Sequence, residues 1–324
     1  MTLVAASEHF AGAPEWTWYI LFYFFLAGLA GGSYFLATLL RYWGAPGDEP
    51  VARLGFYVPF PATVIGLLLL TLDLKRPLRF WHMLFNTTPG EFGLNFNSRT
   101  PMSVGVWVLL VGSAFAFVSF LDALVRDGRI RHPLAGRLAS LLDGGVGMVW
   151  NVLGTILYLF IAGYTGVLIA VSNQPVWSDS WALGGLFLAS GLAGSAALLL
   201  FMARYRAATE SSRGVLEISE RLFTALELLL LVVVVLTLID DGSLDTAFGF
   251  PWILLWLVAL IGMLPGLLGL AREGLTASDS PPVTLTAGGA VAAERARLWV
   301  WTAVPWLVLV GVLALRAAVI FSAQ

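Results

Sequence analysis

Eight long apolar stretches divide the sequence, and they limit its fold more than any other feature. Each is long enough to cross the hydrocarbon core of a bilayer as a helix, which takes roughly 20 residues. The stretches are approximately Thr17–Tyr42, Phe56–Leu74, Met102–Val125, Val149–Val171, Leu183–Ala203, Leu222–Ile239, Trp252–Leu270 and Leu298–Phe321. The sequence therefore predicts an all-α fold: a polytopic membrane protein with eight transmembrane helices.

The composition supports this interpretation. Hydrophobic residues make up 59% of the chain and charged residues 12%, and the mean hydropathy is +0.86. A soluble domain carries about 25% charged residues. Because so apolar a polypeptide cannot cover itself with polar surface in water, the lipid bilayer must be its solvent. The net charge of −2 argues against a nucleic-acid partner.

Residue types that hold redox centres are scarce. The chain has no cysteine, which excludes disulfides and an iron–sulfur cluster of its own. Its three histidines, His9, His82 and His132, lie outside the deep parts of the predicted spans. An intramembrane haem usually needs two buried histidine ligands, so we expect no haem and no metal site in this chain.

A short motif occurs twice. Residues 25–33 of the first stretch resemble residues 187–195 of the fifth, if one inserted residue is allowed. We therefore expect one membrane domain over residues 1–324, built as a parallel repeat of two four-helix halves, residues 1–180 and 181–324. The alternative is independent convergence on small residues, which are common where membrane helices pack together.

Basic residues predict the orientation, because they gather in cytoplasmic links. They occur after the third, fifth and seventh stretches, but not after the fourth or sixth. The basic residues in question are Arg126, Arg129, Arg131, Arg137, Arg204, Arg206, Arg213, Arg272, Arg295 and Arg297. Both termini should therefore face the outer, periplasmic side of a bacterial plasma membrane.

One group of cations contradicts that rule. Lys75, Arg76, Arg79 and Arg99 follow the second stretch, on the predicted outer side. We call these four residues the outer basic cluster. Their position indicates a local function, and the alternative is that they merely cap a helix end.

Three acidic residues fall within or at the ends of the spans, where charge is costly and is therefore a functional candidate. Asp73 lies near the outer end of the second stretch, and it could exchange protons with a ligand or pair with Arg79 or Lys75. Glu227 lies in the middle of the sixth stretch and Asp122 near the cytoplasmic end of the third. Either could belong to a proton path, or make an ordinary hydrogen bond between helices.

Two phenols occur at a similar depth below the outer face. Tyr23 follows the aromatic run that begins at Trp16, and Tyr164 lies near the outer end of the fourth stretch. A buried tyrosine needs a hydrogen-bond partner for its hydroxyl group. A quinone carbonyl would serve, and so would a neighbouring helix carbonyl. Tyr19 and His82, at the outer interface, are weaker candidates to touch such a ligand, and His82 could simply be solvated.

The order and spacing of several motifs resemble the NrfD/PsrC family, the polysulfide-reductase-type membrane subunits of quinone-linked oxidoreductases. The resemblance covers about the first two-thirds of the chain. The matching positions are Trp18, Gly28-Leu29-Ala30-Gly31-Gly32, Asp73-Leu74, Pro77-Leu78-Arg79-Phe80, Ser98, Pro101-Met102-Ser103, Gly105, Trp107, Tyr164-Thr165-Gly166-Val167-Leu168 and Pro175-Val176-Trp177.

The resemblance implies a helical bundle that binds menaquinone or ubiquinone but carries no redox cofactor of its own. Tyr164 would donate a hydrogen bond to the quinone head, beside Thr165. Tyr23 stands where some members have histidine, so a hydrogen bond is expected there but not proton transfer by histidine. The outer basic cluster, including Arg79, would line a docking surface or stabilise negative charge on the reduced head.

The predicted function is that of a quinone- or quinol-binding anchor in a multi-subunit respiratory oxidoreductase, not catalytic alone. The resemblance implies two protein partners, a ferredoxin-like iron–sulfur subunit that exchanges electrons with the quinone and a large catalytic subunit of the molybdopterin type. Proton transfer through Glu227 and Asp122 would accompany this exchange of electrons. Two alternatives remain: a secondary transporter for ions or small solutes, and a purely structural anchor.

Overall fold

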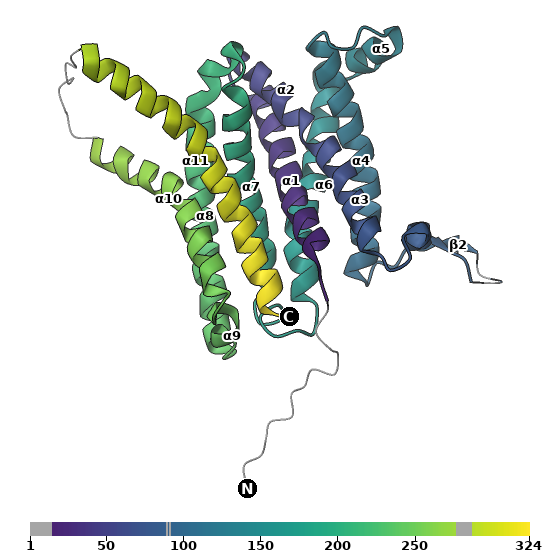
Figure 1. The fold of residues 1–324 in the computed structure, drawn as a ribbon. Helices are drawn as coiled ribbons and strands as arrows, with labels where there is room; N and C mark the ends of the chain where they lie inside the picture. Colours follow the sequence, from purple (N-terminus) through teal and green to yellow (C-terminus); the bar gives the residue numbers. More distant parts are fainter. Residues whose placement is uncertain (1–14, 89, 91, 277–286) are drawn as a thin grey trace.

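The computed structural model describes residues 15–88, 90, 92–276 and 287–324, and within these ranges the side chains of 207, 208, 210 and 270–302 are outside the description (Figure 1). The first half of the chain forms α1 (Trp18–Trp43), η1 (Pro46–Asp48), α2 (Glu49–Tyr57), α3 (Pro59–Asp73), η2 (Pro77–Met83), β1 (Phe85–Asn86), β2 (Gly93–Leu94), α4 (Pro101–Arg126), α5 (Pro133–Leu141) and α6 (Gly144–Ala170). The second half forms α7 (Leu183–Ala203), η3 (Ala207–Ser212), α8 (Arg213–Asp240), α9 (Leu244–Phe248), α10 (Ile253–Thr276) and α11 (Ala287–Ser322).

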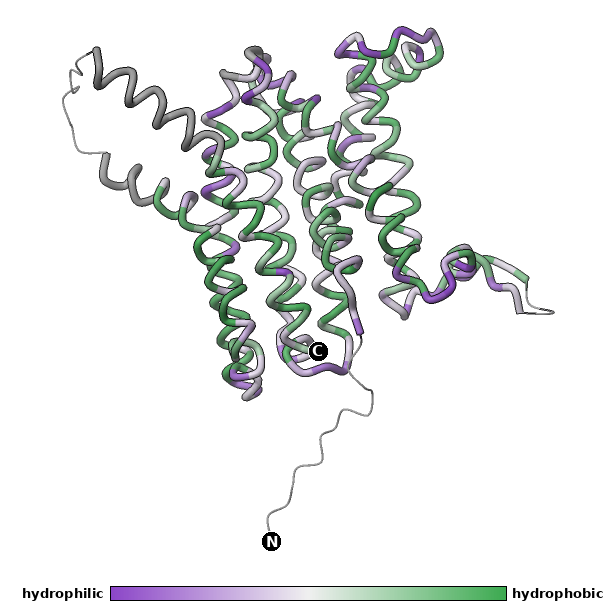
Figure 2. The backbone as a smooth tube through the Cα atoms, in the orientation of Figure 1, coloured by the Kyte–Doolittle hydropathy of each residue, from purple (hydrophilic) through white to green (hydrophobic). Residues whose placement is uncertain are grey.

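The prediction of an all-α, polytopic membrane protein is confirmed. Within the described residues, 7 helical segments are long and apolar enough to cross a bilayer, and Ile253–Gly269 is a shorter apolar helix. Figure 2 shows the apolar residues along the middle of these helices. The count of eight transmembrane helices stays a prediction, because the segment in α10 is shorter than the others.

Two of the predicted spans, the second and the sixth, begin well before the predicted residue in the structure. The second comprises η1, α2 and α3 over Pro46–Asp73, and Pro59, which lacks an N–H group, stands at the first turn of α3. The sixth begins at Arg213 rather than Leu222, because charged residues continue the first turns of α8 before its apolar part begins. Hydropathy alone does not detect such polar helical extensions.

Both described ends of the chain lie at the same end of the bundle (Figure 1). The backbone N–H of Trp16 donates to the side-chain oxygen of Gln324 at 3.0 Å. This arrangement agrees with the prediction that the termini share one face, which we call the terminal face. That this face is the outer one stays a prediction.

Small residues join the two halves. α1 packs against α3, α6 and α7, while α7 packs against α8 and α11. A Cβ at Gly191 of α7 would meet the Cα of Gly28 of α1 at 2.9 Å, and the Ser195 hydroxyl donates to the Leu29 carbonyl at 2.9 Å. The two similar motifs therefore face each other across this contact, which we call the α1–α7 seam. The repeat itself stays a prediction.

A network of charges closes the opposite end of the first half. Asp122 of α4 accepts from Arg41 of α1 at 2.6 Å and from Arg126 at 2.8 Å. Asp127 accepts from Arg53, Tyr57 and Arg206 at 3.1, 2.6 and 2.7 Å. These bonds connect α1, α2, α4 and the segment before η3 where, by the basic-residue pattern, the cytoplasm is predicted.

Candidate functional site

Tyr164 lies on α6 close to α4, near the terminal face. The helix contact is tight because α4 presents Gly105 there: a Cβ at that position would collide with the ring and hydroxyl of Tyr164. Phe160, one turn earlier, stacks on the Tyr164 ring with centroids 5.6 Å apart. Glycine on one helix and a stacked ring on the other therefore fix where this phenol lies.

A pocket of about 410 Å³ lies beside Tyr164, between the start of α4 and the end of α6. Its polar lining comes from Tyr164, Ser98 and Arg99, and its apolar lining includes Val104 and Phe160. Apolar pockets with a few convergent polar groups are the usual form of a small-molecule site, and their volumes range over about 300–1,000 Å³. The predicted residue Tyr164 thus lines a pocket together with Arg99 of the outer basic cluster.

Tyr23 lies on α1 and is 7% exposed. Its ring fits against Gly66 of α3, where a Cβ would approach it to 3.0 Å. The phenol groups of Tyr158 and Tyr164 are close enough to interact with it electrostatically. Among the described residues, neither Tyr23 nor Tyr164 has a hydrogen-bond partner for its hydroxyl. The structure therefore gathers the two predicted phenols in one region and leaves both hydroxyls available.

Asp73 lies at the last position of α3. Its Oδ1 accepts a hydrogen bond from the Thr17 hydroxyl at 2.8 Å. Thr17 is the N-cap of α1, and its Oγ1 also accepts from the Tyr19 backbone N–H at 3.3 Å. Within the described part of the chain Asp73 forms no ion pair with Lys75 or Arg79, so that alternative does not hold, and the carboxylate instead links two helix ends.

The remaining outer residues are more dispersed. Thr165 is fully buried and its hydroxyl donates to the Ala162 carbonyl of its own helix at 2.8 Å, so it does not line the pocket. Tyr19 is 43% exposed on the surface of α1. His82 belongs to η2, where its Nδ1 lies 2.9 Å from the Thr87 hydroxyl and its ring lies 4.1 Å from that of Trp81. Their proposed contacts with a ligand stay predictions.

Of the outer basic cluster, Arg99 lines the pocket, and the other three residues lie on the segment after α3. Lys75, Arg76 and Arg79 are exposed between α3 and the end of η2, on the segment that extends sideways from the bundle in Figure 1. No carboxylate in the described ranges forms an ion pair with any of the four side chains. Their positive charge is therefore free to attract an anionic partner, whereas most other described arginines near the opposite end are paired.

The two acids of the predicted proton path have different surroundings. Asp122 forms ion pairs with Arg41 and Arg126, so a structural role accounts for this carboxylate. Glu227 of α8 is 2% exposed and lies in electrostatic contact with Arg316 of α11. The proton path through these residues stays a prediction. Glu227 is the stronger candidate for it, because the carboxylate of Asp122 is already engaged in two ion pairs.

The sequence interpretation missed a buried polar network in the first half. The Tyr158 hydroxyl lies 2.7 Å from that of Thr63, and its ring stacks on Tyr34 with centroids 5.1 Å apart. The Tyr34 hydroxyl lies 2.8 Å from Ser119, whose hydroxyl donates to Asn151 at 2.8 Å. Asn151, an amide inside an apolar stretch of the sequence, was the signal from which this network could have been predicted.

Over nearly its whole length, the chain matches one protein family. The sequence profile of the family described as "Polysulphide reductase, NrfD" matches residues 6–324. The chain belongs to the NrfD family. NrfD proteins therefore share the last three predicted helices with this chain, which the motifs alone left unmatched.

Individual relatives extend the comparison. Protein NrfD of Escherichia coli is 28% identical over 331 residues, covering 95% of this chain and 95% of that protein. A polysulfide reductase chain from Wolinella succinogenes is 28% identical over 183 residues, covering 55% of this chain and 54% of its own. A selenate reductase subunit from Mesobacillus selenatarsenatis is 32% identical over 77 residues, covering 24% of this chain and 18% of its own. The relatives of this chain thus include proteins named as subunits of reductases.

Proposed function

We propose that this NrfD protein is the quinone- or quinol-binding membrane anchor of a multi-subunit oxidoreductase. In this proposal an iron–sulfur subunit docks at the terminal face and exchanges electrons with the quinone. A large subunit of the molybdopterin type completes the complex. Family membership and relatives that are named as reductase subunits support this assignment.

The pocket beside Tyr164 is the observation that carries the proposal. Its volume of about 410 Å³ suits a quinone head, and the free hydroxyl of Tyr164 is a donor for a carbonyl oxygen. Val167, which also lines the pocket, is 43% exposed on the lipid-facing surface of α6. A hydrophobic molecule can therefore enter from the bilayer rather than from water.

Each residue would have a definite task. Tyr164 orients the head by its hydrogen bond, and the ring of Phe160 supports Tyr164. Arg99 places positive charge at the rim of the pocket, where charge on the head would be stabilised. A bound quinone supplies the electron and proton chemistry, whereas the protein supplies position, hydrogen bonds and electrostatics.

The decisive experiment compares Tyr164→Phe with Tyr205→Phe in the purified complex. Tyr205 is 68% exposed at the opposite end of the bundle, so its hydroxyl serves as a matched control. Tyr164→Phe should lower the quinone content and raise the KM for quinol, because one hydrogen bond is lost, while Tyr205→Phe should change neither. Unchanged affinity in the double variant Tyr23→Phe, Tyr164→Phe would refute this site.

The proposed location is the bacterial plasma membrane, with both termini on the outer side. A reporter enzyme that is active only outside the cytoplasm, fused after Gln324, should then be active. The same reporter inserted beside Gly128 of the α4–α5 link should be inactive. The reverse pattern would contradict the orientation and place the docking subunit in the cytoplasm.

A further inference from the structure

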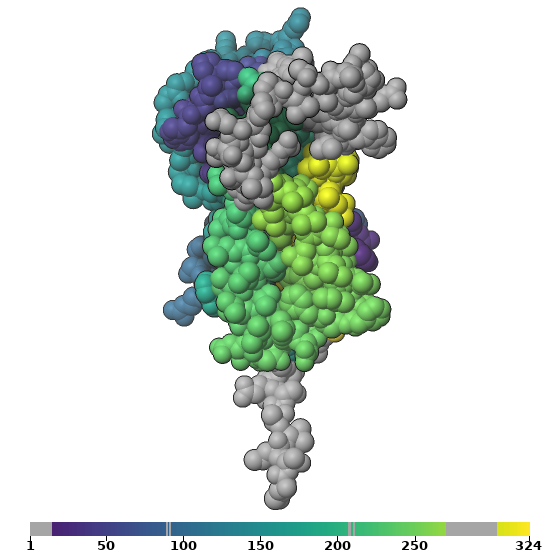
Figure 3. All heavy atoms as spheres, turned by 90° about the vertical axis from the view of Figure 1, so that its left-hand side faces the viewer, coloured from purple at the N-terminus to yellow at the C-terminus, as the bar shows by residue number. Residues whose placement is uncertain are grey.

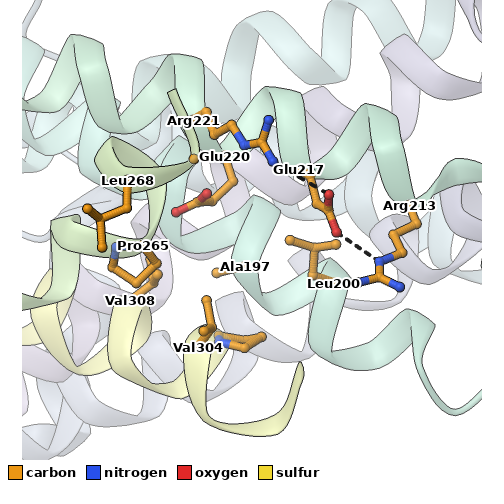
Figure 4. A pocket seen from close by; sticks show the side chains of 12 residues that line it. Ala197, Leu200, Arg213, Glu217, Glu220, Arg221, Pro265, Leu268, Val304 and Val308 are labelled. Atoms are coloured by element: carbon orange, nitrogen blue, oxygen red, sulfur yellow. Dashed lines mark hydrogen bonds and ion pairs between the residues drawn. The ribbon is translucent and has the colours of Figure 1, made fainter. Parts of the chain in front are cut away.

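A second pocket lies in the other half of the bundle, away from Tyr164. It measures about 460 Å³ and lies among α7, α8, α10 and α11. Figure 4 shows Glu217 and Glu220 of α8 on one side of it, with Pro265 of α10 and Val308 of α11 on the other. Because Glu217 lies in the first turns of α8, the charged part of the pocket reaches the bundle end opposite the terminal face. Figure 3 shows α8 and α10 side by side over this half.

A polar stripe leads from this pocket into the interior. Glu220, Thr224 and Glu227 follow one another at spacings of four and three residues, which places them on one face of α8. They are only 6%, 1% and 2% exposed. The Thr224 hydroxyl donates to Glu220 Oε1 at 3.4 Å. Gly266 of α10 makes space for these two side chains, because a Cβ there would lie 2.7 Å from the Thr224 hydroxyl and 3.0 Å from the Glu220 carboxyl.

Glu227 faces a buried cation at the inner end of this stripe. Arg316 of α11 is fully buried and donates to the Ser190 hydroxyl at 2.8 Å and to the Phe187 carbonyl at 2.9 Å, while its Nε has no hydrogen-bond partner. Glu227 forms no hydrogen bond or ion pair with any described residue. The charged groups that act on it are Arg316 and Glu220, because α7 and the described side chains of α10 carry none.

Arg316 brings this polar stripe close to the α1–α7 seam. Its guanidinium lies 5.2 Å from the ring centroid of Phe187, and that ring lies 6.2 Å from Phe24, the neighbour of Tyr23. A Cβ at Gly28 would collide with the Arg316 guanidinium. The rings between Arg316 and Tyr23 are apolar, so the polar stripe ends at Arg316.

We propose that this half of the bundle contains a one-sided proton well, which opens at the end opposite the terminal face and ends at Glu227 and Arg316. In it, a hydronium ion in the pocket protonates the Glu220 carboxylate and becomes water. The Glu220 carboxylic acid then passes a proton to the Glu227 carboxylate and returns to its ionised form. Seven residues of helix separate these acids by ~10 Å, so the Thr224 hydroxyl and water must relay the proton.

Arg316 sets the inner limit of the well. Its positive charge repels a second cation, so a proton does not pass beyond Glu227. The use of these protons rests on the proposed function, because quinone chemistry at the neighbouring site is what would consume or release them. Water access to the well does not depend on a quinone and can be tested separately.

The first test uses the absence of cysteine from the natural sequence. Glu220→Cys and Thr224→Cys are compared with Leu222→Cys, a position 58% exposed to lipid on the same helix, in sealed vesicles that contain the full complex. A charged, membrane-impermeant thiol reagent is added to one side at a time, and Tyr205→Cys reports which side carries the well. Glu220→Cys and Thr224→Cys should react from the Tyr205 side at least about tenfold faster than Leu222→Cys, because the thiolate needs water. Reaction from the opposite side, or at the rate of Leu222→Cys, would overturn the well.

The second test measures proton movement per electron in the same vesicles. Glu227→Gln should abolish proton uptake from the Tyr205 side during quinone reduction, and Glu227→Asp should retain it, while both complexes reduce quinone after a protonophore is added. Wild-type proton uptake in Glu227→Gln would overturn the well. If no complex, including the wild type, exchanges electrons with quinone, the proposed function fails, and the thiol test still decides whether the well exists.

Discussion

The Thr17 hydroxyl donates a hydrogen bond to Asp73 Oδ1 at 2.8 Å, and so joins the start of α1 to the end of α3. This link holds the first two spans together at the terminal face, six residues before Tyr23. The charge of Asp73 and its role as a hydrogen-bond acceptor can be separated by mutation, because asparagine keeps the acceptor and removes the charge.

We expect Asp73→Asn to slow quinol oxidation without dispersing the complex, since the Thr17 hydroxyl still has an oxygen to donate to. Thr17→Val keeps the charge but removes the cap and the link, and should destabilise the protein by about 1–2 kcal/mol with little effect on the rate per intact complex. Steady-state turnover and thermal unfolding in detergent measure the two effects. Loss of assembly in Asp73→Asn would show that the residue is structural.

Gly105→Ala tests the shape of the pocket without changing a functional group. The added methyl group would displace the Tyr164 ring, because a Cβ at Gly105 would collide with it. The KM for quinol should rise by roughly tenfold, the effect of one misfitted methyl group in a binding site. Gly112→Ala, on the same helix, is the control: the nearest atom to its Cβ would be the flexible end of Ile161 at 3.2 Å, and Tyr158 and Leu157 would lie at ordinary contact distances of 3.7 and 3.8 Å. Equal effects of the two changes would contradict the site.

Asp122→Asn should be strongly destabilising. It removes the fully buried carboxylate partner of Arg41, whose side chain is 8% exposed, and leaves that guanidinium only its pair with the partly exposed Glu49. Breaking a buried ion pair by removing one partner costs about 3–5 kcal/mol. Asp143→Asn breaks the Arg126–Asp143 pair at a carboxylate that is 63% exposed, and should cost at most about 1 kcal/mol. Unfolding in a mixed-micelle titration measures both, and equal stabilities would refute the structural role.

Asp127 predicts a loss of stability in acid. Burial raises the pKa of this carboxyl group, but hydrogen bonds from Tyr57, Arg206 and Arg53 outweigh burial and lower the pKa below its ordinary value of 3.8. Its contribution is therefore complete above pH 3.8 and disappears as the pH falls through the folded-state pKa. Unfolding measured from about pH 5 down to about pH 2 should show a smaller acid-induced decrease in Asp127→Asn than in the wild type or in the exposed-site control Asp240→Asn.

The α1–α7 seam predicts a steric effect within one helix. Gly191→Ala should destabilise the protein by about 1–3 kcal/mol, because its methyl group would meet the backbone of Gly28 at 2.9 Å and backbone cannot move aside. Gly185→Ala, in the same helix, meets only the methyl groups of Leu230 at 3.4 Å, so it should be neutral or stabilising. Thermal unfolding of the two variants measures the difference, and a neutral Gly191→Ala would contradict the close approach.

Much of the fold could be predicted from the sequence because a bilayer imposes one axis on every long apolar helix. Once the spans were placed on that axis, Tyr23 and Tyr164 fell at the same depth, and the structure brings their rings into one region. The polar ends of helices were less predictable. Arg213–Glu220 continues α8 beyond its apolar part, where hydropathy carries no signal.

Contacts between helices could not be predicted in the same way. A helix that is apolar on every side does not indicate which face meets which neighbour, so the partners of Asp122 and Glu227 remained open. Arg41 lies 81 residues before Asp122, and Arg316 lies on the last helix, far from Glu227 in sequence. For Asp73, the ion pair with Lys75 or Arg79 was one of two alternatives, but its hydrogen-bond donor is Thr17, from the helix that precedes it.

The hydrogen bond between Trp16 and Gln324 spans 308 residues of sequence, so it has a consequence for biosynthesis. At about 5–20 residues per second, a ribosome needs roughly 15–60 s between making one end and the other. During that interval α1 is already in the bilayer while α7 and α11 are still being made. The glycine-rich face of α1 must then be covered by lipid or by the insertion machinery. During this delay, α1 of the nascent chain is most exposed to packing against a wrong helix.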